Sequence, residues 1–380
     1  MIGTVQKTEQ NAEKNECRIY VKERETIMKK SMKIMSAAMS GIMVLSLAAC
    51  GGSDAGTTAA QETTVAAASE AKDSADTQAA QEEKADGEAY TVGICQLVQH
   101  DALDAATKGF KDAITEALGA DAVTFDEQNA QGDSNTCSTI INSFVSNDVD
   151  LILANATAAL QAAQAGTSDI PVLGTSVTEY GVALGIDDFT GTVGGNISGT
   201  SDLAPLDEQA AMLHELFPDA KNVGLLYCSA EANSQYQVDT VKAELEKLGY
   251  TCEYYAFSDS NDLSTIVTNA VGACDVIYVP TDNTAASNAE IINNICQPAG
   301  VPIIAGEEGI CKGCGVATLS ISYYDLGVAT GKMAVKIMTG ESNVSEMPIE
   351  YAPQFTKKYN PAACEALGIT VPEGYEAIAE

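Results

Sequence analysis

The sequence DVIYVPTDNTAAS, residues 275–287, joins a short apolar run to a group of polar side chains. Residues 276–279 have the length and β-branched content of a buried strand, and Pro280 cannot continue a central strand. A helix-like segment follows the polar group. In a doubly wound α/β domain, ligands bind outside the carboxyl ends of parallel strands. Asp282 is therefore either a ligand-binding carboxylate or the N-cap of the next helix, which is the commoner use of Asp at such a boundary.

A second copy of this pattern occurs earlier in the chain. Residues 133–163 read DSNTCSTIINSFVSNDVDLILANATAALQAA, and residues 259–289 read DSNDLSTIVTNAVGACDVIYVPTDNTAASNA. Flanking segments repeat as well, and a period this long indicates a duplicated domain rather than a solenoid repeat. We therefore predict an α/β protein with two Rossmann-like lobes, whose polar strand ends face each other across a cleft.

The hydrophobic pattern places strands and helices alternately in each lobe, which predicts parallel sheets covered by helices. The expected first-lobe strands are residues 91–98, 123–125, 151–154 and 172–175, with helices at 101–118 and 138–145. The expected second-lobe strands are 222–228, 253–257, 276–279 and 303–305, with a helix at 238–248. A strand at 318–322 and a helix at 324–338 are expected to return to the first lobe. The chain would then cross between lobes three times, with residues 89–203 and 319–342 in lobe 1 and residues 204–318 and 343–380 in lobe 2.

The N-terminal region has the pattern of a secretion signal. Three lysines, Lys29, Lys30 and Lys33, precede an apolar run over residues 34–49 and the sequence LAAC that ends at Cys50. This sequence resembles a bacterial lipobox, which implies a signal peptide, a lipid (palmitate) on Cys50 and a membrane anchor. The alternative, a transmembrane helix ending in a chance Cys, would need a longer apolar run of roughly 20 residues.

Two further expectations concern the same region. Residues 1–27 lack apolar periodicity, and Met28 or Met32 would be a better start, so residues 1–49 are interpreted as an extension plus signal peptide. Residues 50–88 are rich in Ala, Thr, Ser, Gln, Asp and Glu, and such a composition cannot bury enough surface to fold. This segment is expected to be a disordered linker.

Charge and cysteine usage narrow the possible partners. The net charge of −33 argues against nucleic acid or an anionic membrane surface as a partner, and solubility explains it. Eleven cysteines are present, and an odd number remains after Cys17 and Cys50 are set aside, which does not suggest a complete disulfide framework. Cys311 and Cys314 form a lone C-x-x-C, for which we expect a turn, with a local disulfide as one option. With only two histidines, neither a metal site nor a cofactor is expected.

Several segments together resemble the ABC-transporter substrate-binding proteins of the tryptophan/tyrosine-type family. They are GICQLVQHDALDAATKGF (93–110), NAQGDSN (129–135), LILANATAALQAA (151–163), GGNISGTSD (194–202), ANSQ (232–235), YVPTDN (278–283) and YYDLG (323–327). The resemblance covers about residue 90 to the C-terminus. It implies a type I periplasmic-binding-protein fold that closes on a ligand by hinge motion. It also implies an extracytoplasmic monomer that delivers an amino acid, notably an aromatic one, to an ABC permease and its ATPase.

The resemblance also implies a ligand site at the strand ends of both lobes. The first-lobe candidates are Gln96, His100, Asn129, Gln131, Thr157, Ala158, Thr175 and Ser176, and the second-lobe candidates are Asn233, Ser234, Asp282, Asn283 and Glu307. Asp282 suits the ammonium group of an amino acid, because an ionised carboxylate only accepts hydrogen bonds. Thr157 and the amides that follow suit its carboxylate, since a helix N-terminus favours anions. His100 could equally contact only the hinge or solvent, and Asn129 and Gln131 could be loop-forming residues.

Other classes of function find less support in the sequence. An enzyme would need a nucleophile with a base, or a metal site, and neither G-x-S-x-G nor H-E-x-x-H occurs, so no catalytic residue is expected. The Gly-rich segment 191–196 lacks the lysine of a phosphate-binding loop. The alternatives that stay open are a ligand-sensing lipoprotein and a binding protein for a nucleoside or a sugar.

Overall fold

The computed structural model describes residues 89–352 and 354–379, which form two α/β lobes. The first sheet has the strand order β11-β5-β4-β3-β1-β2, and the second has the order β13-β12-β10-β9-β8-β6-β7. All strand pairs in both sheets are parallel except β10 with β12. The predicted fold class, two Rossmann-like lobes with mainly parallel sheets, is confirmed. The expected extension, signal peptide, Cys50 and linker lie outside the described residues.

The first lobe alternates strands and helices along most of its length. Its elements are β1 (Tyr90–Gln96), α2 (Asp101–Leu118), the short 3-10 helix η1 (Ala120–Ala122), β2 (Val123–Asn129), α3 (Ser134–Ser146), β3 (Leu151–Asn155), α4 (Thr157–Gly166), β4 (Val172–Val177), α5 (Tyr180–Leu184), β5 (Ile197–Ser201), α12 (Tyr323–Met338), η2 (Val344–Glu346) and β11 (Glu350–Tyr351).

The second lobe repeats this arrangement and adds elements from the C-terminal part of the chain. Its elements are α6 (Leu206–Leu216), β6 (Asn222–Cys228), α7 (Ala232–Lys247), β7 (Thr251–Phe257), α8 (Ser260–Val271), β8 (Val276–Val279), α9 (Asn283–Ser287), α10 (Ala289–Ala299), β9 (Ile303–Ala305), α11 (Glu308–Cys314), β10 (Ala317–Ser320), β12 (Thr356–Tyr359), α13 (Pro361–Leu367) and β13 (Glu376–Ala377).

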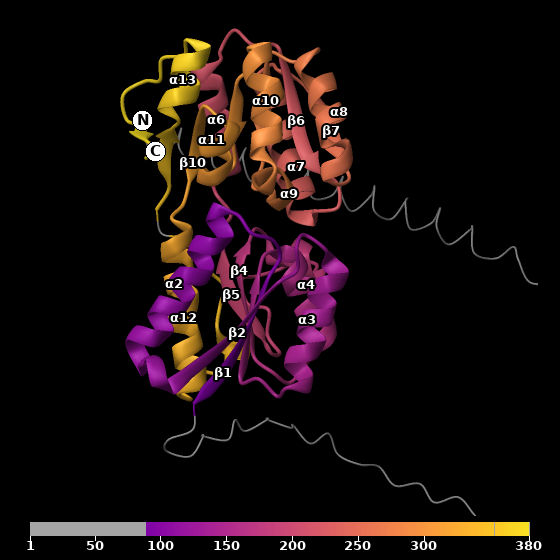
Figure 1. The fold of residues 1–380 in the computed structure, drawn as a ribbon. Coiled ribbons are helices and arrows are strands. Elements are labelled where there is room, and N and C mark those ends of the chain that lie inside the picture. Colours follow the sequence, from indigo (N-terminus) through magenta and orange to yellow (C-terminus); the bar gives the residue numbers. More distant parts are fainter. Residues whose placement is uncertain (1–88, 353, 380) are drawn as a thin grey trace, which may run out of the picture. The chain divides into compact units, whose positions relative to one another are not determined.

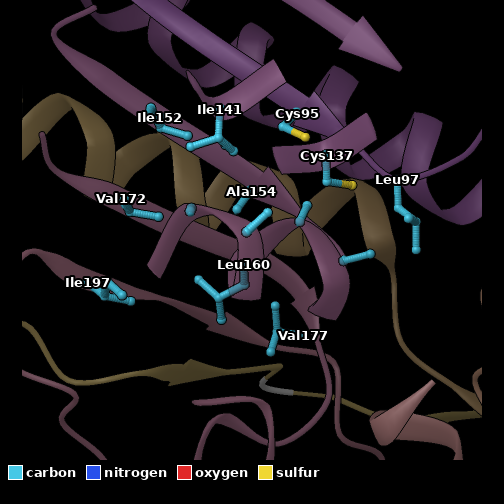
Figure 2. Close-up of a cluster of buried hydrophobic side chains, with 14 of the residues drawn as sticks. Cys95, Leu97, Cys137, Ile141, Ile152, Ala154, Leu160, Val172, Val177 and Ile197 are labelled. Carbon is cyan, nitrogen blue, oxygen red and sulfur yellow. The ribbon is translucent and has the colours of Figure 1, made fainter. Parts of the chain in front are cut away.

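Helices cover both faces of each sheet, so each lobe has two apolar cores. In the first lobe, α3 and α4 pack on one face and α2 and α12 on the other (Figure 1). Figure 2 shows the first of these cores, where Cys95 of β1 and Cys137 of α3 lie among side chains such as Leu160 and Val177. The central strands β3 and β8 are buried at every residue, as expected for parallel strands covered on both sides.

The repeated residues have the same structural role in both lobes. Asp133 and Asp259 are the N-caps of α3 and α8, and each accepts a hydrogen bond from a backbone amide of its helix. Asp150 accepts a hydrogen bond from the Thr91 amide at the start of β1, and Asp275 accepts bonds from the amides of Lys221 and Asn222 at the start of β6. The duplication seen in the sequence therefore preserves helix caps and strand starts, which are structural functions.

The chain passes between the two sheets three times, but the expected boundaries need correction. The strand expected to return to the first lobe is β10 (Ala317–Ser320), which pairs with β9 in the second sheet, because it continues the parallel order of that sheet. Only α12 returns directly. Conversely, residues 343–351 do not belong to the second lobe, since β11 pairs with β5 of the first sheet. The second lobe resumes at β12 (Thr356–Tyr359).

The cysteines in the described residues are all free thiols. Cys311 and Cys314 lie in α11 rather than in a turn, and both are buried in the core of the second lobe. The expected turn is therefore wrong, and no disulfide joins these two residues. Burial raises the pKa of the Cys311 and Cys314 thiols, so they are neutral, apolar core residues.

Helix α12 packs on α2 through glycines that leave no room for a side chain. A Cβ atom at Gly327 would lie 2.0 Å from the carbonyl oxygen of Ala106, and one at Gly109 would lie 2.1 Å from that of Tyr324. A Cβ at Gly331 would lie 2.6 Å from the carbonyl oxygen of Phe110. The two helix backbones therefore meet directly, and this contact fixes α12 to the first lobe.

Replacing Gly327 by Ala should destabilise the protein, because one of the two backbones must move to accommodate the methyl group. We expect a loss of roughly 1–3 kcal/mol in the free energy of unfolding, the usual cost of overpacking. Gly272 provides the matched control, since it is exposed, has a φ of −79° and has no backbone atom closer than 3.5 Å to an added Cβ. Gly272→Ala should gain about 0.4–1 kcal/mol. Urea unfolding of both variants tests this, and equal stabilities would contradict it.

Candidate functional site

A narrow cavity lies at the carboxyl ends of the strands, with walls from both lobes. Its residues are His100, Leu103, Ser176, Thr178, Asp202, Asn233, Thr281, Asp282, Asn283, Ala286, Glu307 and Tyr323. The free space between them is about that of one water molecule. The contact between His100 Nε2 and Asn283 Oδ1, at 3.2 Å, joins the first lobe to the second at this point. Strand ends of both lobes therefore form one enclosed polar site.

Three polar atoms of this cavity have no hydrogen-bond partner although they are buried. They are His100 Nδ1, Ser176 Oγ and Asp202 Oδ1. Only five such side-chain atoms occur among the described residues, so more than half of them belong to this one cavity. A buried polar atom without a partner costs free energy, so such atoms are normally paired with another protein group, a water or a ligand. These three atoms are therefore available for hydrogen bonds with a water or a small molecule in the cavity.

The second-lobe wall is held by a buried network around Glu231. The Glu231 carboxylate accepts hydrogen bonds from the backbone amides of Asn283 and Thr284 and from both of their side chains, at 2.7 to 3.1 Å. The Asn233 amide group donates to Glu231 and to the carbonyl oxygen of Thr281. The loop after β8 is therefore held to α7 and the preceding turn by several hydrogen bonds, and these bonds orient the side chains that it presents to the cavity.

Asp282 serves as a helix cap and also lines the cavity. Its Oδ1 accepts from the amide of Ala285 in α9 at 2.8 Å, and its Oδ2 accepts from the amide of Cys228 at 2.7 Å. Asp282 can therefore act both as the N-cap of α9 and as a ligand-binding carboxylate, because each carboxylate oxygen can accept a second hydrogen bond. Glu307 is arranged similarly, since its two oxygens accept from the amides of Gly309 and Ile310 at the start of α11.

In the first lobe, the helix equivalent to α9 has no such cap. Ala156 occupies the position that corresponds to Asp282, with a φ of 94°, and no side chain caps α4. The amides of its first turn therefore have no partner within the helix, and they carry the positive end of the helix dipole. Thr157 is buried at this N-terminus. This end of the first lobe suits an anion, whereas the corresponding end of the second lobe presents a carboxylate.

A wider groove with a volume of about 300 Å³ adjoins the cavity at Asn283. Its first-lobe wall includes Gln131 and Ala158, and its second-lobe wall includes Glu231 and Thr284. The cavity and the groove together hold eight of the expected site residues, namely His100, Ser176, Asn233, Asp282, Asn283 and Glu307 in the cavity and Gln131 and Ala158 in the groove.

The remaining expected residues lie elsewhere. Gln96 donates to Asp104 and Val98 and accepts from Thr107, so its side chain is engaged within the first lobe. Thr175 belongs to a cluster of threonine hydroxyls with Thr200 and Thr330. Asn129 accepts from the Gln131 amide and shapes their loop. Ser234 is buried in α7, and Thr157 lines neither the cavity nor the groove.

The residues of the cavity and its network that the sequence analysis did not name as candidates include Thr178, Asp202, Glu231 and Tyr323. Asp202 follows β5, a strand that was not predicted, and Tyr323 begins α12 directly after the second crossing. The Tyr323 hydroxyl donates to Asp202 Oδ2 at 2.9 Å. Both residues fall within segments that carry the family resemblance, GGNISGTSD and YYDLG, and this was the one signal that could have identified them.

Burial shifts the acid–base properties of the cavity. It raises the pKa of Asp282 to about 8, with the nearby Glu231 adding to the effect and two backbone hydrogen bonds opposing it. It likewise raises the pKa of Glu307 to about 7 and that of Asp202 above its usual value. Burial lowers the pKa of His100, against the opposing contact with Asn283, so the imidazole is neutral at neutral pH. The ligand-free cavity thus disfavours ionised groups, and a bound cation would reverse this for the carboxylates.

The described residues contain no cluster of three or more acidic, Cys or His side chains that could hold a metal ion. None of the helices within these residues has the length and apolar character needed to cross a membrane. The polar side chains of the cavity can form hydrogen bonds and charge pairs with a small molecule.

Comparison with known proteins agrees with this chemistry. The family described as ABC transporter substrate binding protein matches residues 91–380. The tyrosine-binding protein of Clostridioides difficile (strain R20291) is 37% identical over 260 residues, which is 68% of this chain and 75% of that protein.

Two solved structures cover all or nearly all of their own chains and 76 to 77% of this one. A domain from Streptococcus pneumonia in complex with L-Trp is 33% identical with a TM-score of 0.73. The ligand-free, open structure of a substrate-binding protein with adhesive properties from Clostridium difficile is 38% identical with a TM-score of 0.59. The backbone is thus closer to the complex than to the open structure, although the sequence identity is higher with the latter, which agrees with the narrow cavity.

The raised pKa values predict that the ligand-free protein loses stability as the pH rises from about 4 to about 8. In this window the unfolded chain has already released the protons of Asp282 and Glu307, whose usual pKa values are near 4, while the folded protein still binds them. The folded state therefore binds more protons, so the free energy of unfolding falls with rising pH. Asp282→Asn should reduce this slope, as measured by urea unfolding at pH 5, 6, 7 and 8.

Asp275→Asn is the control for this experiment. Backbone hydrogen bonds lower the pKa of Asp275, so this residue stabilises the folded state only above about pH 4 and its contribution is already complete at pH 5. The variant should be less stable at all four pH values with an unchanged slope. If Asp282→Asn gave a curve parallel to that of the wild type, the raised pKa of Asp282 would be wrong.

Proposed function

Because this chain belongs to the ABC transporter substrate-binding protein family, whose members are extracytoplasmic and bind small ligands without catalysis, we propose that its ligand is an aromatic α-amino acid. The observation that carries this proposal is the enclosed cavity with unpaired polar atoms at the junction of the two lobes. The tyrosine-binding relative and the L-Trp complex support the aromatic class. Delivery to a permease with its ATPase follows from the role of the family.

The difference between the two equivalent helix starts suits the two charges of an amino acid. The uncapped N-terminus of α4, near Thr157 and Ala158, would bind the carboxylate through backbone amides. Asp282, at the corresponding position of the second lobe, would accept from the ammonium group. A ligand held in this way contacts both lobes at once, so it favours the closed arrangement over the open one.

The small free space of the cavity supports an opening motion as part of this function. Room for about one water molecule cannot admit an amino acid, so the lobes must separate for entry. The three crossings between the sheets are the segments that would bend. Each lies between a strand of one sheet and the first element of the other lobe. The mechanism we propose is hinge opening, ligand entry and closure, followed by docking of the closed, monomeric form on the permease.

We further propose that Cys50 carries the lipid that anchors the protein to the outer face of the cell membrane. The basic start, the apolar run and the LAAC sequence support this assignment. The linker of residues 50–88 would then join the anchor to the folded lobes.

A thermal-shift screen of the purified protein tests the ligand class, since a ligand that binds only the native state raises the melting temperature. We expect stabilisation by tyrosine, tryptophan or phenylalanine. Concentrations near 100 times the dissociation constant should add about 2.7 kcal/mol of stability. Nucleosides and sugars serve as negative controls. Stabilisation by these compounds and by no amino acid would overturn the proposal and favour the nucleoside or sugar alternative.

A further inference from the structure

Asp202 occupies the first crossing between the lobes and has one carboxylate oxygen free. It directly follows β5 (Ile197–Ser201) and is 4% exposed. Its Oδ2 accepts a hydrogen bond from the Tyr323 hydroxyl, and its Oδ1 has no partner. The cavity that it lines also contains Ser176 Oγ and His100 Nδ1, which are unpaired as well. Asp202 Oδ1 is therefore a hydrogen-bond acceptor without a donor, and it shares its cavity with two other polar atoms that also lack a partner.

Both oxygens of each of the other two carboxylates of this cavity, Asp282 and Glu307, already have hydrogen-bond donors. Each oxygen of Asp282 and each oxygen of Glu307 already accepts a backbone amide hydrogen within the second lobe. An ionised carboxylate only accepts hydrogen bonds, so the group that completes Asp202 must be a donor, and a cationic donor gives the strongest pair in a buried site. An ammonium group carries three such donors.

We propose that Asp202 Oδ1 accepts a hydrogen bond from the ammonium group of the bound ligand, opposite Asp282. This inference rests on the proposed function and adds a first-lobe residue to the recognition of the amine. The ammonium group would then bridge a carboxylate from each lobe, with Ser176 Oγ available as a third acceptor. A bridge of this kind requires both walls of the cavity and forms only when the lobes are closed.

The hydrogen bond between Tyr323 and Asp202 would connect the bound ligand to a second crossing segment. Tyr323 is the first residue of α12 and follows the second crossing, so its bond to Asp202 joins two of the three crossings. A ligand held by Asp202 is thereby connected to both segments through one side chain. Tyr323 acts as a positioning residue, because it fixes the direction in which the free oxygen of Asp202 points.

The test compares tyrosine with its desamino analogue, 3-(4-hydroxyphenyl)propanoate, which lacks only the amine. Affinities are measured by calorimetry for the wild-type protein, Asp202→Asn and Tyr323→Phe, with the melting temperature as the check of folding. The wild type should prefer tyrosine over the analogue. Asp202→Asn should weaken tyrosine binding roughly 10- to 100-fold and leave the analogue nearly unchanged, as expected for the loss of a hydrogen bond to a charged group.

Tyr323→Phe should reduce the same preference several-fold, and it keeps the inference testable if Asp202→Asn does not fold. Tyr278→Phe is the matched control, since Tyr278 is a fully buried tyrosine whose hydroxyl donates to Gln209, outside the cavity. It should leave both affinities unchanged.

The outcomes separate this inference from the proposed function. Tyrosine binding within twofold of the wild type in Asp202→Asn would overturn the role of Asp202 while the amino-acid function stands. Equal losses for tyrosine and the analogue would also overturn it, because they would show a structural effect. A wild-type protein that binds no aromatic amino acid would instead refute the proposed function.

Discussion

Burial of carboxylates at the junction of the two lobes is the constraint on which the site depends. A carboxylate removed from water needs donors or a cation, or it takes up a proton. Backbone amides donate to both oxygens of Asp282 and to both oxygens of Glu307, whereas Oδ1 of Asp202 has no hydrogen-bond partner. The acceptor that still lacks a donor, Asp202 Oδ1, belongs to a residue that lines the cavity. Ligand selection in this protein is thus a matter of which molecule completes an unfinished set of hydrogen bonds.

The duplication explains how one chain provides both a helix start that suits a carboxylate and a side chain that suits an ammonium group. The two lobes share helix caps and strand starts, so Asp133 and Asp259 have equivalent positions. They differ at the loop that follows the third strand of each copy, where the first lobe has Ala156 and the second has Asp282. At this loop the first lobe has an uncapped helix start that suits an anion, whereas the second lobe presents the Asp282 side chain at the corresponding position. Two lobes of similar fold therefore present different polar groups at corresponding positions.

The sequence predicted the fold well because its signals were strong. Apolar β-branched runs identified the buried strands, and the internal repeat gave the two lobes and their shared topology. The signals were weaker at the crossings, where no periodicity exists, so β10 was assigned to the wrong sheet and β11 was missed. The deciding factor there is pairing with a distant strand, which local pattern does not encode.

The candidate site was predicted in part for a related reason. Position at a strand end was readable, but successive side chains of a strand point to opposite faces, and an end residue can turn either way. Ser176 reaches the cavity, whereas its neighbour Thr175 bonds to Thr200 and Thr330 inside the first lobe. Asp202 and Tyr323 were not predicted as site residues because they are far apart in sequence. They come together only after the chain has passed twice between the lobes.

The glycine contact between α2 and α12 has a consequence for the order in which the protein matures. One face of the first sheet is covered by side chains of both helices, and Met333, Ala334 and Ile337 of α12 belong to that core. The part of the chain that leaves the ribosome first is therefore incomplete until a helix from its last quarter arrives. Long-range contacts of this kind delay folding. The first lobe therefore reaches its fully covered state only after the chain has been synthesised as far as α12 (Tyr323–Met338).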